Sequence, residues 1–418
     1  MSSWICLRRT GLPLLCLFVH GVVYSQALLD PAFRLNQSEM AILESGEFRD
    51  DLPCKVTPEK PSLGFDLRFH ADYTVSIPVK NLAPGGEQLM VRLRVTPIAG
   101  AADEILMTDR LNVPAIPEDA KGRGSFPGGF ALGLGRYRVD WLMRDRQGRY
   151  CSSHWQADAK LAAGERDLPI GLPPNAVAAL AEEPGWGHAT HVSGGGDALH
   201  VKILLNVAPA DASRIVLDRG ELDVLGSLLQ NIEREPQFHS FTLVAFNIYT
   251  QKIIQRQENV SRIDMRSLAS AIDKSDVGTI NYQSLLDPRS APRFIARVLV
   301  GELGDGMPKA DVVLVAGPKA SVEGKVPLEQ LKELGEAVPI FYFSYIADPV
   351  RNPFRDPIGA ALKVYKTSSE FKIVRPRDMG VAISHLLLWV RTHSSGGVRT
   401  SRNIAGQTEY AAYTAGSN

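Results

Sequence analysis

His200-Val-Lys-Ile-Leu-Leu-Asn-Val-Ala-Pro-Ala-Asp211 is the segment that best indicates the fold of the C-terminal half of the chain. Within it, residues 201–207 form an almost continuous apolar run, which is typical of a strand buried on both faces of a parallel sheet. Two similar runs follow at 311–316 and 339–345. Segments with helical apolar spacing separate them, so strands and helices alternate through this half of the chain. The pattern predicts a doubly wound α/β domain over residues 200–393.

The expected elements of this half have the order β-α-β-β-α-α-β-α-β-β-α. Besides the three buried strands, we expect strands at 241–248, 252–257 and 371–374 and helices at 221–234, 266–273, 292–302, 328–337 and 377–392. An edge strand follows the second strand directly, and this order resembles the von Willebrand factor A-type domain. The resemblance rests on element order and implies the fold of that family.

The resemblance also implies where a divalent cation would bind, and this sequence lacks the ligands. The family carries Asp-x-Ser-x-Ser at the end of the first strand and Asp-Gly after the fourth. Here the first three positions are Asn206, Ala208 and Ala210, and Ala316-Gly317 replaces the Asp-Gly. Hard cations need several oxygen ligands. We therefore expect a degenerate site that holds no metal, and no other cofactor.

The carboxyl edge of the sheet is the candidate binding site. Ligands of open α/β sheets bind beyond the carboxyl ends of the strands, where the connecting loops diverge. The residues expected to line this rim are Asn206, Asp211, Ser213, Asn247, Gly317 and Lys319. We expect them to bind a partner and assign no catalytic residue among them.

The sequence lacks the common motifs of nucleophilic and metal-dependent catalysis. It contains no Gly-x-Ser-x-Gly and no His-Glu-x-x-His, and its α/β half has no cysteine. The loop 317–325 ends in Gly-Lys, but six residues separate its first glycine from that pair where a phosphate loop has four. We therefore expect a non-catalytic protein of the adhesion type that binds another protein or a cell-surface component. The alternative is an extracytoplasmic hydrolase with its site at the carboxyl edge, built from Asp211, Ser213 or Asp287.

The N-terminal half alternates apolar and polar residues with the period of strands. In residues 89–96, two valines and a leucine share one face while Arg92 and Arg94 lie on the other. Such alternation is typical of half-buried antiparallel strands. Repeated short strands of this kind predict an all-β sandwich of the immunoglobulin-like type over residues 61–165.

Three other segments lie around these two domains. Residues 28–60 are polar and form an N-terminal extension. Residues 166–199 are rich in Pro, Gly and Ala, and we expect a linker that lets the two domains reorient. The Ser- and Gly-rich tail 394–418 is expected to be disordered.

The first 27 residues have the pattern of a secretory signal peptide. Arg8 and Arg9 precede a short apolar run, and small or polar residues follow it at 24–27. The run is shorter than the roughly 20 apolar residues that span a bilayer, and no later stretch is apolar enough. We expect cleavage after Ser25 or Ala27 and an exported protein, periplasmic or extracellular, with no transmembrane segment.

Cysteine usage and net charge fit an exported protein. Cys54 and Cys151 are the two cysteines that remain after signal removal, and an oxidising compartment favours a disulfide between them over two separate thiols. Lysine and arginine total 46, and so do aspartate and glutamate, among the 418 residues. The balance gives no bulk attraction to nucleic acid.

Overall fold

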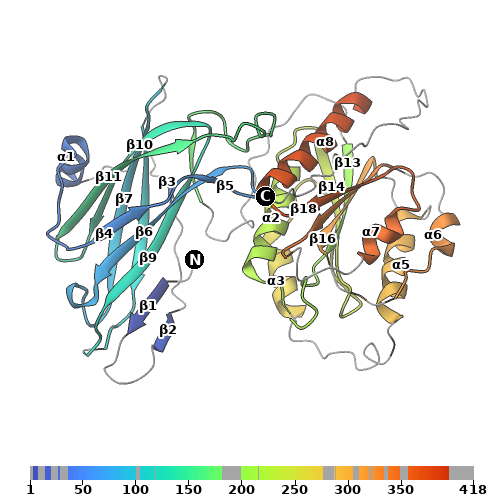
Figure 1. Cartoon of the computed structure of the whole chain (residues 1–418), viewed down its shortest axis with the longest axis horizontal. Helices are drawn as coiled ribbons and strands as arrows, with labels where there is room; N and C mark the ends of the chain where they lie inside the picture. Colours follow the sequence, from blue (N-terminus) through green and yellow to red (C-terminus); the bar gives the residue numbers. More distant parts are fainter. Residues whose placement is uncertain are drawn as a thin grey trace, which may run out of the picture.

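The computed structural model of the chain contains a β-sandwich and an α/β domain side by side (Figure 1). It describes residues 3–7, 15–19, 27–28, 36–99, 104–117, 119–180, 199–214, 216–275, 287, 289–304, 310–319, 322, 324–333, 338–348 and 356–394. Antiparallel sheets come first, and a mostly parallel sheet with helices follows. This confirms the prediction that an all-β part of the chain precedes an α/β part.

The sandwich consists of two antiparallel sheets. Its strands are β1 Ser3–Leu7, β2 Leu15–Val19, β3 Ala27–Leu28, β4 Lys55–Pro58, β5 Ser62–Leu63, β6 Phe69–Pro78, β7 Glu87–Pro97, β8 Ile105–Val113, β9 Arg123–Leu132, β10 Gly135–Arg144, β11 Tyr150–Ala159 and β12 Val177–Ala179, and the 3-10 helix η1 spans Val79–Asn81. One sheet has the order β2-β1-β9-β6-β4, with β12 on β9 and β5 on β6, and the other has the order β11-β10-β7-β8-β3. The inward side chains of β7 and β10, such as Leu93 and Trp141, are buried between the sheets as the alternation predicts.

A helix that the sequence pattern did not predict, α1 (Gln37–Ser45), covers the outer face of the second sheet. Arg94 donates to the Asp140 carboxylate at 2.9 Å and to the carbonyl of Leu43 in α1. Arg92 and Arg94 are therefore only 6% and 5% exposed, although they lie on the face that the alternation marks as polar. The helix turns a polar sheet face into a buried layer of ion pairs.

Asp109 of β8 places a carboxylate on the inward face of the sandwich. It is 5% exposed and shares the inward face of the strand with Met107 and Leu111. The Arg110 backbone N–H donates to it at 2.7 Å, but burial dominates and raises its pKa to about 6. The folded chain thus binds this proton more tightly than the unfolded chain, so ionisation lowers stability as the pH rises through about 6.

We expect Asp109→Asn to raise the free energy of unfolding by about 2–3 kcal/mol at pH 8, because it removes a buried charge. The gain should shrink to near zero below about pH 4, where the carboxyl is protonated in both states. Urea denaturation at the two pH values measures the effect, with the exposed Asp50→Asn as control. An equal rise in the free energy of unfolding at both pH values would show that loss of the buried Asp109 charge is not the cause.

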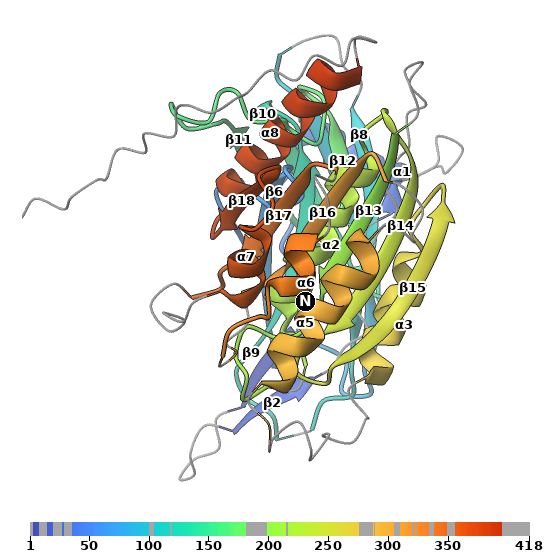
Figure 2. The same ribbon diagram turned by 90° about the vertical axis from the view of Figure 1, so that its right-hand side faces the viewer.

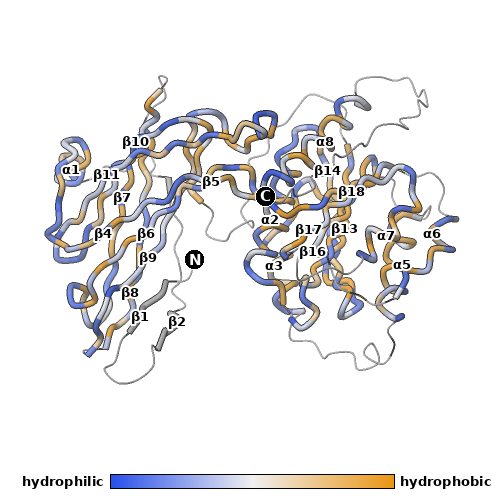
Figure 3. Tube along the Cα trace, in the orientation of Figure 1, coloured by the Kyte–Doolittle hydropathy of each residue, from blue (hydrophilic) through white to orange (hydrophobic). Residues whose placement is uncertain are grey.

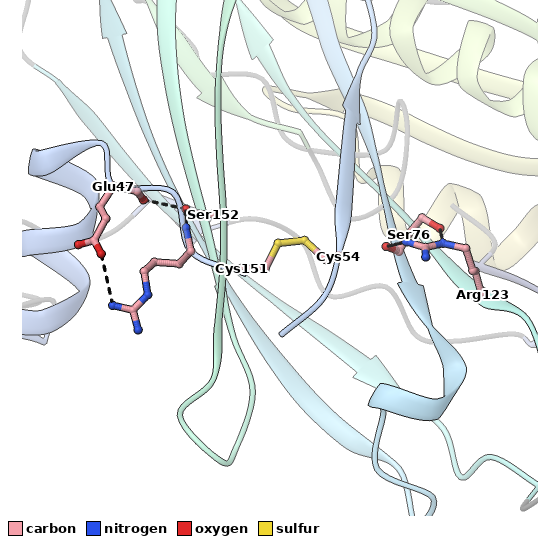
Figure 4. The surroundings of a disulfide bond; sticks show 7 residues. Glu47, Cys54, Ser76, Arg123, Cys151 and Ser152 are labelled. Carbon is pink, nitrogen blue, oxygen red and sulfur yellow. Dashed lines mark hydrogen bonds and ion pairs between the residues drawn. A yellow bond between two sulfur atoms is a disulfide. The ribbon is translucent and has the colours of Figure 1, made fainter. Parts of the chain in front are cut away.

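Cys54 and Cys151 form the predicted disulfide (Figure 4). Their Cα atoms lie 6.2 Å apart, and the bond joins the segment before β4 to β11, and so one sheet to the other. Beside it, the Ser152 hydroxyl donates to the Glu47 carbonyl at 2.9 Å and accepts from the Arg49 N–H at 2.7 Å. These bonds fix the N-terminal extension to the sandwich.

The α/β domain has a six-stranded sheet. Its elements are β13 Leu199–Asn206, α2 Arg219–Glu233, β14 Phe238–Asn247, β15 Lys252–Val260, α3 Met265–Ser275, α5 Ser290–Leu303, β16 Val312–Pro318, α6 Glu329–Glu333, β17 Ile340–Tyr345, α7 Pro357–Leu362, β18 Ser368–Ile373 and α8 Pro376–Ser394. The strand order is β15-β14-β13-β16-β17-β18, and β15 pairs antiparallel while the other neighbours are parallel. The sequence pattern predicts each of these elements except α7.

Helices cover both faces of this sheet. α2, α3 and α8 pack on one face, and α5, α6 and α7 pack on the other, where they stand in front of the sheet in Figure 2. Along α2, α5 and α8 hydrophobic and hydrophilic residues alternate (Figure 3), as expected of helices with one buried stripe. Among the described helices, none is long and apolar enough to cross a membrane.

The loop between β5 and β6, residues 64–68, docks onto the α/β domain, and we call it the latch loop. Its Leu67 is 2% exposed and packs within a core cluster of the α/β domain. The Phe65 and Tyr345 rings make an edge contact with centroids 6.0 Å apart. These contacts hold the domains together, whereas the composition of 166–199 predicts free reorientation. Residues 181–198 of that expected linker, and the tail after 394, lie outside the described residues.

Candidate functional site

Asn206 ends β13 at the position where the resembling family has its first cation-binding aspartate. Its side chain is completely buried. The amide Nδ2 donates to the Pro318 carbonyl at 3.2 Å, and Oδ1 accepts from the Ala208 N–H at 3.1 Å. The amide therefore ties the end of β13 to the end of β16. An aspartate at this position, ionised at neutral pH, would have no donor for the first of these bonds.

Gly317 lies directly against this tie. A Cβ atom at this position would stand 2.5 Å from the Asn206 carbonyl oxygen and 2.7 Å from the Asn206 Cβ. The φ of Gly317 is +152°, in the region that favours glycine. Gly317 thus serves close packing of two strand ends.

Asp211 and Ser213 form an exposed turn in the loop after β13. Asp211 Oδ1 accepts from the Ser213 N–H at 2.9 Å and from its hydroxyl at 2.7 Å. The serine hydroxyl thus donates straight to a carboxylate, without an imidazole base between them. Asp287, the third residue of the hydrolase alternative, pairs instead with Arg293. The described contacts do not bring Asp287 to the other two.

The start of α2 fixes the backbone of the loop that follows β13. Glu221, which is fully buried, accepts from the Ala210 N–H at 2.8 Å and pairs with Arg214 at 2.8 Å. Asp218 and Glu221 also form a capping box, which satisfies the free N–H groups of the first turn. The loop that carries the family's hydroxyl ligands is therefore fixed here by a carboxylate of the helix.

Asn247 ends β14 and is 4% exposed. Its Oδ1 accepts from the N–H groups of Tyr249 and Thr250, at 2.9 and 3.1 Å. These bonds shape the turn into β15, as asparagine side chains commonly do. Like Asn206, it is a predicted rim residue whose side chain is engaged in holding the backbone.

Lys319 lines a pocket at the carboxyl edge of β16 and β17, which we call the lysine pocket. Its volume is about 220 Å³, and it is lined by Lys319, Ser344, Ile346, Asp356, Gly359, Ala360, Lys363, Glu370 and Lys372. The Lys319 N–H donates to the Tyr345 carbonyl at 2.7 Å, which fixes the backbone of this wall. Three lysines from three elements thus surround one cavity.

The Asp356 carboxylate at the base of the lysine pocket is occupied by donors of the protein. It accepts from the Tyr342 hydroxyl at 2.7 Å, the Ser344 hydroxyl at 2.9 Å, and the N–H groups of Ile358 and Gly359 at 3.0 and 3.2 Å. Burial, and then the Asp356 charge, raise the pKa of Tyr342 well above its usual value, so the phenol stays a donor. The carboxylate holds the start of α7 on β17.

The second carboxylate of the pocket is partly neutralised. Glu370 Oε2 lies 3.9 Å from Lys363 Nζ, in a pair whose lysine side chain is 72% exposed. Three ammonium groups therefore face two carboxylates, one of them saturated with donors. Such a pocket is suited to one anionic group of a ligand, because its volume is below the roughly 300 Å³ that drug-sized ligands need.

A larger and more open cavity of about 500 Å³ lies beside α5, where Gln251, Ser290, Arg293, Ala296, Arg297, Pro327 and Glu329 line it. Its cations are already engaged. Arg293 pairs with Asp287, and the Arg297 guanidinium lies 5.9 Å from the centroid of the Phe294 ring. Three cations line the lysine pocket and two line this cavity, so the lysine pocket is the better candidate for an anionic ligand.

The lysine pocket holds two carboxylates, Asp356 and Glu370, as its potential metal ligands among the described residues. Within the described ranges of the chain, no group of three or more His, Cys, Asp or Glu side chains is arranged to hold a metal ion. The positions of the family's ligands are occupied by the Asn206 tie and by alanines, which carry no side-chain oxygen.

Sequence reasoning found Lys319 and missed most of the lysine pocket. Asp356 and Lys363 are the N-cap and C-cap of the short helix α7, and Lys372 lies within β18. The one local signal was Asp356-Pro357, since an N-cap aspartate followed by proline is typical of a helix start.

Comparisons with known proteins give no family for this chain. No family model matches the sequence, and no curated protein matches it. Among solved structures, the Northeast Structural Genomics Consortium target SoR45 is 15% identical over 28% of this chain and 95% of its own, with a TM-score of 0.18. A β-glucosidase from Listeria innocua is 6% identical over 26% of this chain and 16% of its own, with a TM-score of 0.17. The PilB minor pilin from Streptococcus sanguinis is 10% identical over 76% of this chain and 90% of its own, with a TM-score of 0.26. At these TM-scores the superpositions carry no argument about function.

Proposed function

We propose that the chain is an exported, non-catalytic binding protein of the adhesion type, whose von Willebrand A-like domain binds its partner without a metal. The observation that carries the proposal is the lysine pocket at the carboxyl edge of the sheet. Lys319, Lys363 and Lys372 provide positive charge at an edge where the family has a cation. The partner would be another protein, or a cell-surface component, that presents acidic groups.

Export is supported by the covalent chemistry of the chain. The Cys54–Cys151 disulfide is the kind of bond that persists in oxidising compartments. The positively charged and then apolar start of the sequence fits a signal peptide for a periplasmic or extracellular location. Parts of this segment form β1 and β2, which extend the sandwich from β9 in the uncleaved chain and which cleavage would remove.

The binding proposal is tested with the purified protein, labelled with a fluorophore, on intact cells and isolated envelopes of the organism that makes it. We expect combined Lys319→Glu, Lys363→Glu and Lys372→Glu to weaken binding by on the order of tenfold or more, because complementary charge is reversed. Binding should also fall with salt.

Arg136→Glu on the sandwich is the control, because Arg136 is exposed on β10 and does not line the lysine pocket. Equal loss from this control, or no loss from the lysine variant at an unchanged melting temperature, would move the binding site away from the lysine pocket.

We expect Mg²⁺ or Mn²⁺ to leave the melting temperature and the cell binding unchanged. A specific ion at 100 times its Kd would stabilise the fold by about 2.7 kcal/mol, and Ala208 and Ala210 supply no ligand for one. Differential scanning calorimetry with each ion and with chelator measures this. A rise of several degrees that chelator reverses would contradict metal-independent binding.

A further inference from the structure

The latch loop inserts apolar side chains of the sandwich into the α/β domain. Leu67 packs with residues of α2 and α8 in one core cluster, and a Cβ atom on Gly380 of α8 would lie 3.3 Å from its Cδ2. The φ of Leu67 is 59°. This backbone conformation is unfavourable for a leucine and persists only when surrounding contacts impose it. The Gly171 N–H donates to the Leu67 carbonyl at 2.7 Å, so the loop is braced from its own domain.

Polar contacts from α2 fix the backbone of the same loop. Asn231 Nδ2 donates to the Phe65 carbonyl at 2.9 Å, and Arg234 Nη1 donates to the Asp66 carbonyl at 2.8 Å. Burial lowers the pKa of Arg234 to about 10, with nearby Arg68 acting in the same direction. This guanidinium still remains charged near neutral pH. The docked state therefore depends on charges that the interface shields from water.

Several titratable groups lie where the latch loop contacts the α/β domain. Asp66 is 9% exposed, and its Oδ1 lies 3.0 Å from Nε2 of His70. The charged groups that act directly on this pair are Arg68 and Asp72 from the sandwich and Asp223 and Arg234 from the α/β domain. The charged or titratable neighbours of these groups are Glu59 from the sandwich and Arg219, Glu235, Tyr345 and Arg391 from the α/β domain. Asp223 acts on His70 from across the domain boundary, so the charge state of the pair depends on docking.

We infer that the latch loop is a pH-responsive device, which docks the two domains tightly in mildly acidic medium and loosens as the medium becomes alkaline. The inference does not rest on the proposed function. It rests on the inserted Leu67, on the α2 hydrogen bonds, and on the buried Asp66–His70 pair that lies between them.

The direction of the response follows from the bound protons. Burial lowers the pKa of His70, but the hydrogen bond to Asp66 and the charges of Asp66, Asp72 and Asp223 outweigh it and raise that pKa. Burial raises the pKa of Asp72 and of Asp223, and raises that of Glu235 to about 7. Of the charges that act on His70, that of Asp223 crosses the domain boundary, whereas Asp66 and Asp72 lie in the sandwich. A protonated His70 therefore attracts Asp223 in the docked state, and this attraction is lost as the pH rises through the raised pKa of His70. The raised pKa of Glu235 acts in the same direction, because burial favours its protonated form.

Asp66 responds in the opposite direction. Burial raises its pKa, but the hydrogen bond and charge of His70 lower it further, and the net pKa is below the usual value. Its contribution is present above its unfolded pKa and is lost only in stronger acid. Docking should therefore be tightest in mildly acidic medium and weaken as the pH rises through about 7, where Glu235 loses its proton, and through the raised pKa of His70.

Loosening would also reach the lysine pocket. Phe65 contacts the Tyr345 ring, and the Tyr345 carbonyl accepts the Lys319 N–H. The latch loop thus rests on the strand end that forms one wall of the pocket.

Hydrogen–deuterium exchange of the purified full chain tests the inference at about pH 5.5 and 8.5, with rates corrected for intrinsic exchange. We expect residues 64–68 and the facing turn of α2 to exchange about threefold to tenfold faster at the higher pH, with a larger radius of gyration in X-ray scattering. His70→Gln, which keeps a hydrogen-bond donor but does not titrate, should remove most of the difference between the two pH values.

His154→Gln is the matched control, since His154 lies exposed on β11, and it should keep the wild-type difference. Leu67→Asp should give fast exchange in the latch loop at both pH values and so marks the undocked state. Equal protection of wild type at both pH values, or an unchanged pH response in His70→Gln, would overturn the inference. Slow exchange of the latch loop in the Leu67→Asp protein would also overturn it, because the domains would then stay docked without the inserted leucine.

Discussion

Removal of the disulfide by combined Cys54→Ser and Cys151→Ser should lower the free energy of unfolding of the sandwich by about 4 kcal/mol. The bond closes a loop with a sequence separation of 97 residues, and cross-linking so long a loop strongly restricts the unfolded chain. For a domain of this size the loss corresponds to a fall of about 10–20 °C in melting temperature. The loss should appear in the sandwich transition of a calorimetric scan.

Reductant provides the control for this experiment. It should destabilise the wild-type protein to about the level of the double variant and leave the double variant unchanged. Thiol labelling of native, unreduced protein should find neither Cys54 nor Cys151. Two labelled thiols, or a double variant that melts with the wild type, would contradict a stabilising disulfide and remove one support for export.

The fold of the α/β half was predictable because its strands are buried on both faces. β13 and β16 have apolar residues at almost every position, a pattern that few other structures produce. The six-residue α7 escaped prediction because it offers little more than one helical turn of periodicity. The nine-residue α1 escaped for another reason: besides a small apolar cluster of Ile42 and Leu43 with Leu142, it contacts the sandwich through ion pairs, as between Glu39 and Arg92.

The candidate site was predictable in place but only partly in its residues. Strand ends show where the rim lies, but residue types there do not reveal whether a side chain faces a ligand or its own backbone. Asn206 and Asn247 hold turns and strand ends, and Lys319 lines a cavity. Lys363 and Lys372 reach the same cavity from elements distant in sequence, a convergence that needs the three-dimensional sheet order.

Asn206→Asp should be strongly destabilising even though it introduces the aspartate that von Willebrand A-type domains have at the end of their first strand. The substitution replaces the Nδ2 donor, 3.2 Å from the Pro318 carbonyl, by a second oxygen in a fully buried position. A buried carboxylate facing a carbonyl loses its hydration and gains repulsion, so we expect a cost of about 2–4 kcal/mol at pH 7. Urea denaturation measures it, and the exposed Asn112→Asp should change stability by less than about 0.5 kcal/mol.

The pH dependence of the Asn206→Asp variant tests the cause of that loss. Burial should raise the pKa of the new carboxyl, so its cost should shrink as the pH falls and the protonated group again donates to the Pro318 carbonyl. Mg²⁺ should not restore stability at pH 7, because Ala208 and Ala210 provide no oxygen to complete an ion's shell. Recovery with Mg²⁺ would mean that other oxygens already surround this point, and metal-independent binding at the rim would then have to be abandoned. Full stability at pH 7 would instead show that the amide tie does not hold the ends of β13 and β16 together.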